Sequence, residues 1–175
     1  MDTFHLRIFQ RQVLDQCQFL LFSAQDLHSG VLSQNSTRAI YAIQNLLNAA
    51  ANISKMLWGQ KGKHSEARKP LRDSIGISDD SPLRKVTMRN HFEHMDERID
   101  RWWAESEDHN HIDMIVGPRA AFDFDTAQID MFRIFDPSTA DVVFWGEEHN
   151  LEDLIQEVQQ IMPKLQEEAG KPHFD

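Results

Sequence analysis

Residues 37–59 read TRAIYAIQNLLNAAANISKMLWG. Apolar residues recur there at intervals of three and four, which is the pattern of one long amphipathic helix. The positions that share this spacing are Ile40, Ile43, Leu47, Ala50, Ser54 and Leu57. Ser33 or Asn35 is a suitable N-cap for this helix, and Gly59 and Gly62 lie beyond its end.

The segment before this helix has the same periodicity. The positions spaced by three and four are Leu6, Phe9, Val13, Cys17, Leu20, Ala24 and Leu27. Ser29 and Gly30 follow, and we expect them to end the first helix because glycine is common at helix C-termini. The short interval between the two segments predicts two long antiparallel helices.

Two further helices are predicted after Gly62. A short one covers Ser65–Ser74. The next begins with Ser81 as its cap and Pro82 at its first position, where the missing proline N–H costs no hydrogen bond. This helix is expected to continue to Trp103 or Glu105.

The composition of the chain then changes. QIDMFRIF (128–135) and ADVVFWG (140–146) are rich in β-branched and aromatic residues and flank the turn sequence DPST, which predicts a β-hairpin. IDMIVG (112–117) is a candidate third strand. Asn150 is the expected start of a last amphipathic helix, whose apolar positions are Leu151, Leu154, Ile155, Val158, Ile161, Met162 and Leu165.

We therefore expect a mainly α fold in a single domain spanning residues 1–175. Residues 1–105 would form a four-to-five-helix bundle, and residues 106–175 would add a small β-hairpin and a C-terminal helix. A chain of 175 residues, 41% of them hydrophobic, is long enough to bury one core.

The charge is distributed unevenly. The net charge of −10 argues against non-specific nucleic-acid binding. Residues 61–89 nevertheless carry eight Lys and Arg against four Asp and Glu, whereas residues 90–175 carry six against 21. The basic segment is either a solvated surface or a binding patch.

The sequence also bears on location. No apolar run approaches the length of a membrane helix, and the N-terminal residues carry charge where a signal peptide would be apolar. Cys17 is the only cysteine, which excludes an intramolecular disulfide and a zinc site built on cysteine pairs. We expect a cytoplasmic protein that does not associate with membranes.

The segment MRNHFEHMDERI (88–99) concentrates polar chemistry on one predicted helix. With Arg89 set at zero on a helical wheel, Asn90 falls at about 100° and His94 at about 140°. The apolar stripe lies nearly opposite, so these three residues are expected to point away from the core. The residues of the stripe are Met88, Phe92, Met95, Ile99, Trp102 and Trp103.

His91 falls between the polar arc and the apolar stripe, and we interpret it as a hydrogen-bonding residue at the boundary. His91 and His94 could in principle share a metal ion, with Glu93 and Glu97 as further ligands. The sequence offers no second helix with a matching ligand pair, so we predict neither a metal nor another cofactor.

The arc of Arg89, Asn90 and His94 suits ribonucleotide cleavage by internal attack of the 2′-hydroxyl group. His94 would transfer a proton, and Arg89 would stabilise the charge that develops on the phosphate oxygens. Asn90 would hold the imidazole or contact the phosphate. A two-fold dimer would supply a second proton-transfer group.

The pattern Arg89-Asn90-x-x-x-His94 resembles the Arg-x4-His motif of HEPN domains (higher eukaryotes and prokaryotes nucleotide-binding). The two long helices before the motif are similar as well, and the resemblance covers residues 1–105. It implies metal-independent RNase activity at a site formed across a homodimer. It also implies a role in toxin–antitoxin or phage-defence systems, with a small nucleotidyltransferase as antitoxin in some.

Two features depart from that family pattern. Asp96 stands where some of these toxins carry a modifiable tyrosine. Carboxylates at Glu93, Glu97 and Asp100 would repel an RNA backbone unless a partner or nearby cations neutralise them. The candidate substrate-binding cations are Arg84, Lys85 and Arg98. The alternative hypothesis is a non-catalytic HEPN-like module for dimerisation, partner binding or nucleotide binding.

Overall fold

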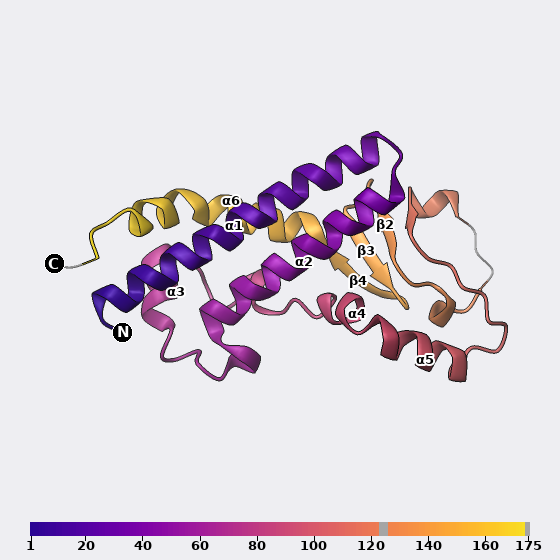
Figure 1. Ribbon diagram of the computed structural model, residues 1–175, viewed down its shortest axis with the longest axis horizontal. Helices are drawn as coiled ribbons and strands as arrows, with labels where there is room; N and C mark the ends of the chain where they lie inside the picture. The colour runs from indigo at the N-terminus through magenta and orange to yellow at the C-terminus, as the bar shows by residue number, and fades with distance from the viewer. Residues whose placement is uncertain (123–125, 174–175) are drawn as a thin grey trace. The chain divides into compact units, whose positions relative to one another are not determined.

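The structure is a computed structural model that describes residues 1–122 and 126–173 (Figure 1). It is mainly helical with a small sheet and a C-terminal helix, as the sequence predicts. The helices and 3-10 turns are α1 (Thr3–Leu32), α2 (Ser36–Trp58), η1 (Gln60–Gly62), α3 (Lys69–Ile75), η2 (Pro82–Arg84), α4 (Arg89–Glu93), α5 (Met95–Glu105), η3 (Arg119–Ala121), η4 (Gln128–Asp130) and α6 (Leu151–Ala169). The strands are β1 (Ile115–Val116), β2 (Ile134–Asp136), β3 (Asp141–Phe144) and β4 (Glu147–Asn150). In the described residues, no helix combines the length and apolarity needed to cross a bilayer.

The chain divides into two compact units, each built from segments distant in sequence. Unit 1 comprises Met1–Ser23, Asn45–Val86 and the chain from Asp153 onward. Unit 2 comprises Ala24–Gln44 and Thr87–Glu152. The helices α1 and α2 each contribute residues to both units.

The connection between α1 and α2 differs from the prediction. Gly30 does not end α1 but lies inside it, where a Cβ would be only 2.7 Å from the backbone nitrogen of Ala39. Glycine at this position therefore permits the close approach of α2. The chain reverses at Gln34, whose φ is 53°. Asn35 caps α2 as predicted, because its side-chain oxygen accepts a hydrogen bond from the Arg38 N–H at 2.9 Å.

The core of unit 1 surrounds α2, which is apolar on most sides. Its buried residues in this unit include Leu46, Leu47, Ala49, Ala50, Ile53 and Leu57. The buried Arg72 of α3 donates to the carbonyl oxygens of Leu57 and Ser65 at 2.8 and 2.7 Å. Its Nε also lies 3.2 Å from Asp79 Oδ1. This arginine therefore ties α3 to the C-terminal end of α2 and satisfies the carbonyl group of Leu57 in its last turn.

The C-terminal end of α6 is joined to α1 by charged groups within unit 1. Glu168 is buried, and its carboxylate lies 3.1 Å from Arg7 Nη1. Lys171 and Lys164 lie 2.5 and 3.2 Å from the same carboxylate. The hydrogen bond from Lys171 lowers the pKa of Glu168 to about 2, although burial acts in the opposite direction.

Unit 2 contains a small sheet with the strand order β1-β2-β3-β4 among the described residues. The predicted hairpin is confirmed as the antiparallel pair β2 and β3, and the predicted third strand pairs with β2 in parallel. At the hairpin turn, the Asp136 carboxylate accepts a hydrogen bond from the Ser138 N–H at 2.8 Å. The sequence prediction missed β4, which pairs with β3. Its polar residues give no apolar alternation.

The single helix predicted from Pro82 to about Glu105 is wrong. Ser81 caps a 3-10 turn in which Pro82 takes the first position, but Lys85 then has extended backbone angles of −129° and 95°. A second break falls at His94, whose φ of −106° and ψ of 43° separate α4 from α5. The motif therefore lies on two short helices that meet at His94.

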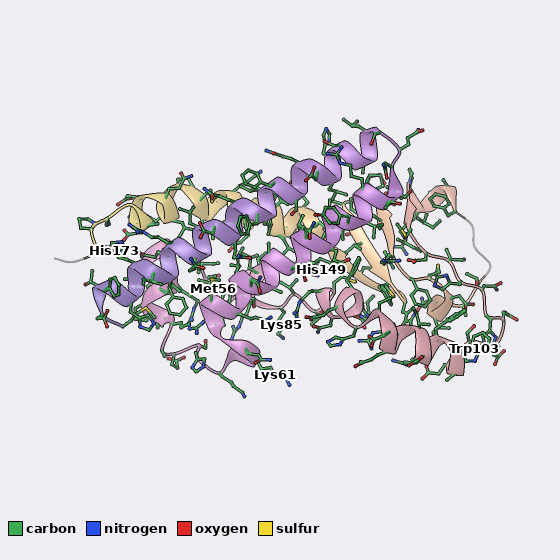
Figure 2. The ribbon with its side chains drawn as sticks, in the orientation of Figure 1. Met56, Lys61, Lys85, Trp103, His149 and His173 are labelled. Atoms are coloured by element: carbon green, nitrogen blue, oxygen red, sulfur yellow. The ribbon has the colours of Figure 1, made fainter. Side chains whose placement is uncertain are left out.

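This break changes the outward face of α5. Met88 and Phe92, before the break, are buried as predicted. Ile99 and Trp103, which the sequence prediction placed in the apolar stripe, are 45% and 66% exposed. Figure 2 labels Trp103 on α5. Trp102 is partly buried. The error has a simple cause, because the non-helical residue resets the phase of every side chain that follows it.

A buried carboxylate holds α5 in place. Asp130, fully buried, accepts hydrogen bonds from Trp102 Nε1 at 2.8 Å and from Ser106 Oγ at 2.6 Å. A third comes from Thr126 Oγ1 at 3.1 Å. Burial raises the pKa of this carboxyl group, but these hydrogen bonds outweigh it and hold the pKa below its ordinary value.

Candidate functional site

The guanidinium group of Arg89 is paired within the motif. Arg89 is the first residue of α4, and its Nη2 lies 2.6 Å from Oε1 and 2.5 Å from Oε2 of Glu93, one turn later. Only 18% of the Arg89 side chain is exposed. Arginine and glutamate four residues apart on a helix are well placed for this contact. The charge of Arg89 is therefore largely neutralised by a neighbour in the same helix.

The imidazole of His94 lies between two carboxylates. Its Nε2 is 3.9 Å from Glu93 Oε2, and its Nδ1 is 3.8 Å from Glu97 Oε1. The His94 side chain is 48% exposed, so it can exchange protons with solvent. Both distances are near the limit of an ion pair and longer than hydrogen bonds. His94 is thus near negative charge without being fixed in one orientation.

One carboxylate oxygen connects these two residues. Glu93 Oε2 is the atom closest to Arg89 Nη2 and also the atom nearest His94 Nε2 in the contacts described above. The two nitrogens are therefore no farther apart than the sum of 2.5 and 3.9 Å. The fold thus places the guanidinium group of Arg89 and the imidazole of His94 near a single carboxylate oxygen of Glu93.

Asn90 completes the predicted group. Its side chain is exposed, and its Oδ1 accepts a long hydrogen bond of 3.5 Å from Arg89 Nη1. Its backbone carbonyl accepts the N–H of His94 at 3.0 Å, which closes the last turn of α4. Arg89, Asn90 and His94 are therefore brought together on one side of unit 2.

Beneath this surface, His91 is buried and fully hydrogen-bonded. Its ring stacks on Phe144 with centroids 4.7 Å apart, and its Nδ1 accepts a hydrogen bond from Arg98 Nε at 3.1 Å. Because Nδ1 accepts, the ring proton of the neutral form is on Nε2, which donates to Glu147 Oε2 at 3.0 Å. His91 is a boundary residue of the kind the sequence predicts, and it links α4 and α5 to the sheet.

The predicted substrate-binding cations belong to different units of the chain. Arg98 is directed inward, where it donates to His91 and its guanidinium carbon lies 5.8 Å from the centre of the Trp145 ring. Arg84 and Lys85 belong to unit 1 and are exposed. Figure 2 labels Lys85. Arg84 donates to the carbonyl oxygen of Asp79 at 2.8 Å. Arg98, the predicted cation in unit 2, is thus already hydrogen-bonded to His91.

The electrostatic character of the site is acidic. Glu93 and Glu97 lie within 4 Å of His94, and Glu147 is hydrogen-bonded to the buried His91. Asp96 on the first turn of α5 is exposed as well and makes no ion pair within the described residues. An approaching phosphate would have to displace the Glu93 carboxylate from Arg89 before it could use that charge.

The sequence prediction missed Glu147 as a partner of the motif. It comes from β4, 56 residues after His91, and no spacing within the sequence links the two positions. The contact between Arg89 and Glu93 could have been predicted from the sequence, because opposite charges four residues apart on a helix attract each other.

Within the ranges 1–122 and 126–173, no group of three or more His, Cys, Asp or Glu side chains is arranged to hold a metal ion. The chain matches no model of a protein family, no curated protein and no solved structure. Its function is therefore inferred from the residues of this site.

Proposed function

We propose that the protein is a metal-independent endoribonuclease of the HEPN type, with Arg89 and His94 as catalytic residues at a site formed across a homodimer. One observation supports this proposal above the others. Arg89 and His94 both lie close to a single carboxylate oxygen of Glu93, the position that a phosphate oxygen would take in a complex with RNA.

The reaction needs only the groups named here. The 2′-hydroxyl oxygen attacks the adjacent phosphorus, and the bond from phosphorus to the 5′ oxygen breaks. The products are a 2′,3′-cyclic phosphate and a 5′-hydroxyl group. His94 would accept the 2′-hydroxyl proton, Arg89 would stabilise the negative charge on the phosphate oxygens, and His94 of a second copy would protonate the leaving oxygen. Asn90 would hold Arg89 in position through its side-chain oxygen.

The test is cleavage of a set of single-stranded RNAs in excess chelator. We expect cleavage by the wild type, loss of at least a hundredfold in rate for His94→Ala, and a 2′,3′-cyclic phosphate on the products. His28→Ala, which removes another exposed histidine, is the matched control and should retain the wild-type rate. Absence of cleavage by the wild type, or equal cleavage by His94→Ala, would refute the proposal.

Glu93 provides a second measurement. Replacing it with glutamine removes the carboxylate that neutralises Arg89 while it keeps the size of the side chain. If phosphate competes with this carboxylate, Glu93→Gln should bind RNA more tightly than the wild type, with the larger gain at low salt. Unchanged or weaker RNA binding would mean that Arg89 does not contact the substrate.

The alternative function, a non-catalytic module for binding a partner or a nucleotide, is favoured by a different observation. The Arg89 side chain is only 18% exposed and already paired, which is the expected state of a structural arginine. In that case Arg89→Met would lower the stability of the protein, and RNA cleavage would be absent from both wild type and variant.

A further inference from the structure

One face of α1 carries large apolar side chains that are about half exposed, and one of them, Phe4, also contacts the ring of His173 with centroids 5.6 Å apart. Phe4, Ile8, Phe19 and Phe22 are 45%, 44%, 50% and 58% exposed, and all four belong to unit 1. At about 100° per residue they fall within about 60° of one another on the helix. They form a single stripe along α1, about 27 Å long at 1.5 Å per residue.

This stripe is distinct from the side of α1 that faces the core. Val13, Cys17 and Leu20 are fully buried and project from the opposite side of the helix. Single exposed apolar residues are common in proteins, but four aligned on one helix are typical of an interaction surface.

Two charged residues lie in the middle of the stripe. Arg11 and Asp15 are both exposed. On the helical wheel Asp15 falls within the arc of the apolar residues, and Arg11 falls about 20° outside it. Arg11 Nε donates to the Ala169 carbonyl at 3.2 Å, and Asp15 Oδ2 accepts a weak hydrogen bond from Gln12 at 3.4 Å. Neither forms an ion pair with another described residue. Within residues 1–122 and 126–173, these two opposite charges therefore have no ionic partner.

The order of residues along the stripe is nearly symmetric about position 13. Phe4 and Phe22 lie nine residues on either side of it, and Arg11 and Asp15 lie two residues on either side. Ile8 and Phe19 lie five residues before and six after. A helix surface with this order is complementary to itself when a second copy is placed antiparallel. Apolar residues then meet apolar residues, and Arg11 meets Asp15 of the second copy twice.

We propose that this face of α1 is a two-fold symmetric interface with a second copy of the chain, in which the two α1 helices pack antiparallel. Two-fold interfaces use the same patch on both copies, and the stripe meets that condition. The charges also make a lipid surface a poor partner, because Asp15 lies in the centre of the apolar stripe and Arg11 is the cation beside it. The inference does not rest on the ribonuclease proposal.

The test is the oligomeric state of the full chain and of two charge reversals, measured by sedimentation equilibrium. Asp15→Arg would bring two arginines together at each contact, and Arg11→Asp would bring two aspartates together. Each variant alone should dissociate at least tenfold more readily than the wild type. An equimolar mixture of the two variants should form a heterodimer, because opposite charges then face each other at both contacts.

Asp108→Arg is the control, since it makes the same change at an exposed position outside α1 and should leave the dimer intact. Circular dichroism establishes that each variant is folded. A monomeric wild type would overturn the inference, as would charge-reversal variants that remain dimeric. So would a mixture in which no heterodimer forms. The charge-reversal variants separate this interface from the catalytic proposal, because variants that remain dimeric and still cleave RNA would overturn the α1 interface alone.

Discussion

Replacing Asp130 with alanine is expected to destabilise the protein strongly. The carboxylate is fully buried and accepts hydrogen bonds from Trp102, Ser106 and Thr126. Hydrogen bonds to a charged acceptor contribute about 1.5 to 3 kcal/mol each. Removal of a buried charge recovers part of its desolvation cost, so we expect a net loss of about 3 kcal/mol in the free energy of unfolding.

Asparagine at position 130 tests the contribution of the charge, because it removes the charge and keeps the shape of the side chain. Its Oδ1 can still accept from Trp102 and Ser106, and its Nδ2 can donate to the hydroxyl oxygen of Thr126. We expect Asp130→Asn to lose only about 1 kcal/mol. Because the pKa of Asp130 is lowered in the folded state, its contribution is present above the ordinary carboxyl pKa and is lost as the pH falls through the lowered value. The difference in the free energy of unfolding between wild type and Asp130→Asn should therefore become smaller in acid.

The measurement is urea-induced unfolding followed by circular dichroism, with Asp108→Ala as an exposed-carboxylate control. The free energy of unfolding of the control should lie within about 0.5 kcal/mol of the wild-type value. The reasoning is refuted if Asp130→Ala is as stable as the control, because the three hydrogen bonds would then contribute nothing. It is refuted equally if Asp130→Asn loses as much as Asp130→Ala.

Two other expectations follow from buried groups of unit 1. Glu168 has a pKa of about 2 in the fold, so its contribution to stability is present above the ordinary carboxyl pKa and declines in acid. Between pH 6 and pH 3 the wild type should lose about 2 kcal/mol more than Glu168→Gln in urea unfolding, and parallel pH profiles would contradict this. Burial raises the pKa of the Cys17 thiol to about 12, so iodoacetamide at pH 8 should label it more than tenfold faster in urea than in the native protein. Equal labelling rates would show that Cys17 is accessible in the fold.

The sequence alone determined most of the helices and the hairpin of this protein. Their signals are local, because apolar periodicity, an N-cap such as Asn35 and a turn such as DPST act within a few residues. It also predicted the grouping of Arg89, Asn90 and His94, because residues this close in a helix necessarily lie near one another.

Only the tertiary structure decided what those elements contact. Gly30 looked like a helix end, but the approach of Ala39 makes it a packing position inside α1. The break at His94 exposed Trp103, which a continuous helix would have placed with the core. Such outcomes depend on contacts between segments far apart in the chain, which no local pattern contains.

The candidate site shows the same division. Arg89 and Glu93 pair through a spacing that can be read from the sequence. Glu147 reaches His91 only because β4, with its polar and non-alternating residues, adds to the edge of the sheet in unit 2. Local spacing thus determined which groups of the motif meet, whereas the buried hydrogen bonds that hold the motif arise from the fold. The physical reason is that the hydrogen bond between His91 and Glu147 joins residues 56 positions apart and forms only when the chain is compact.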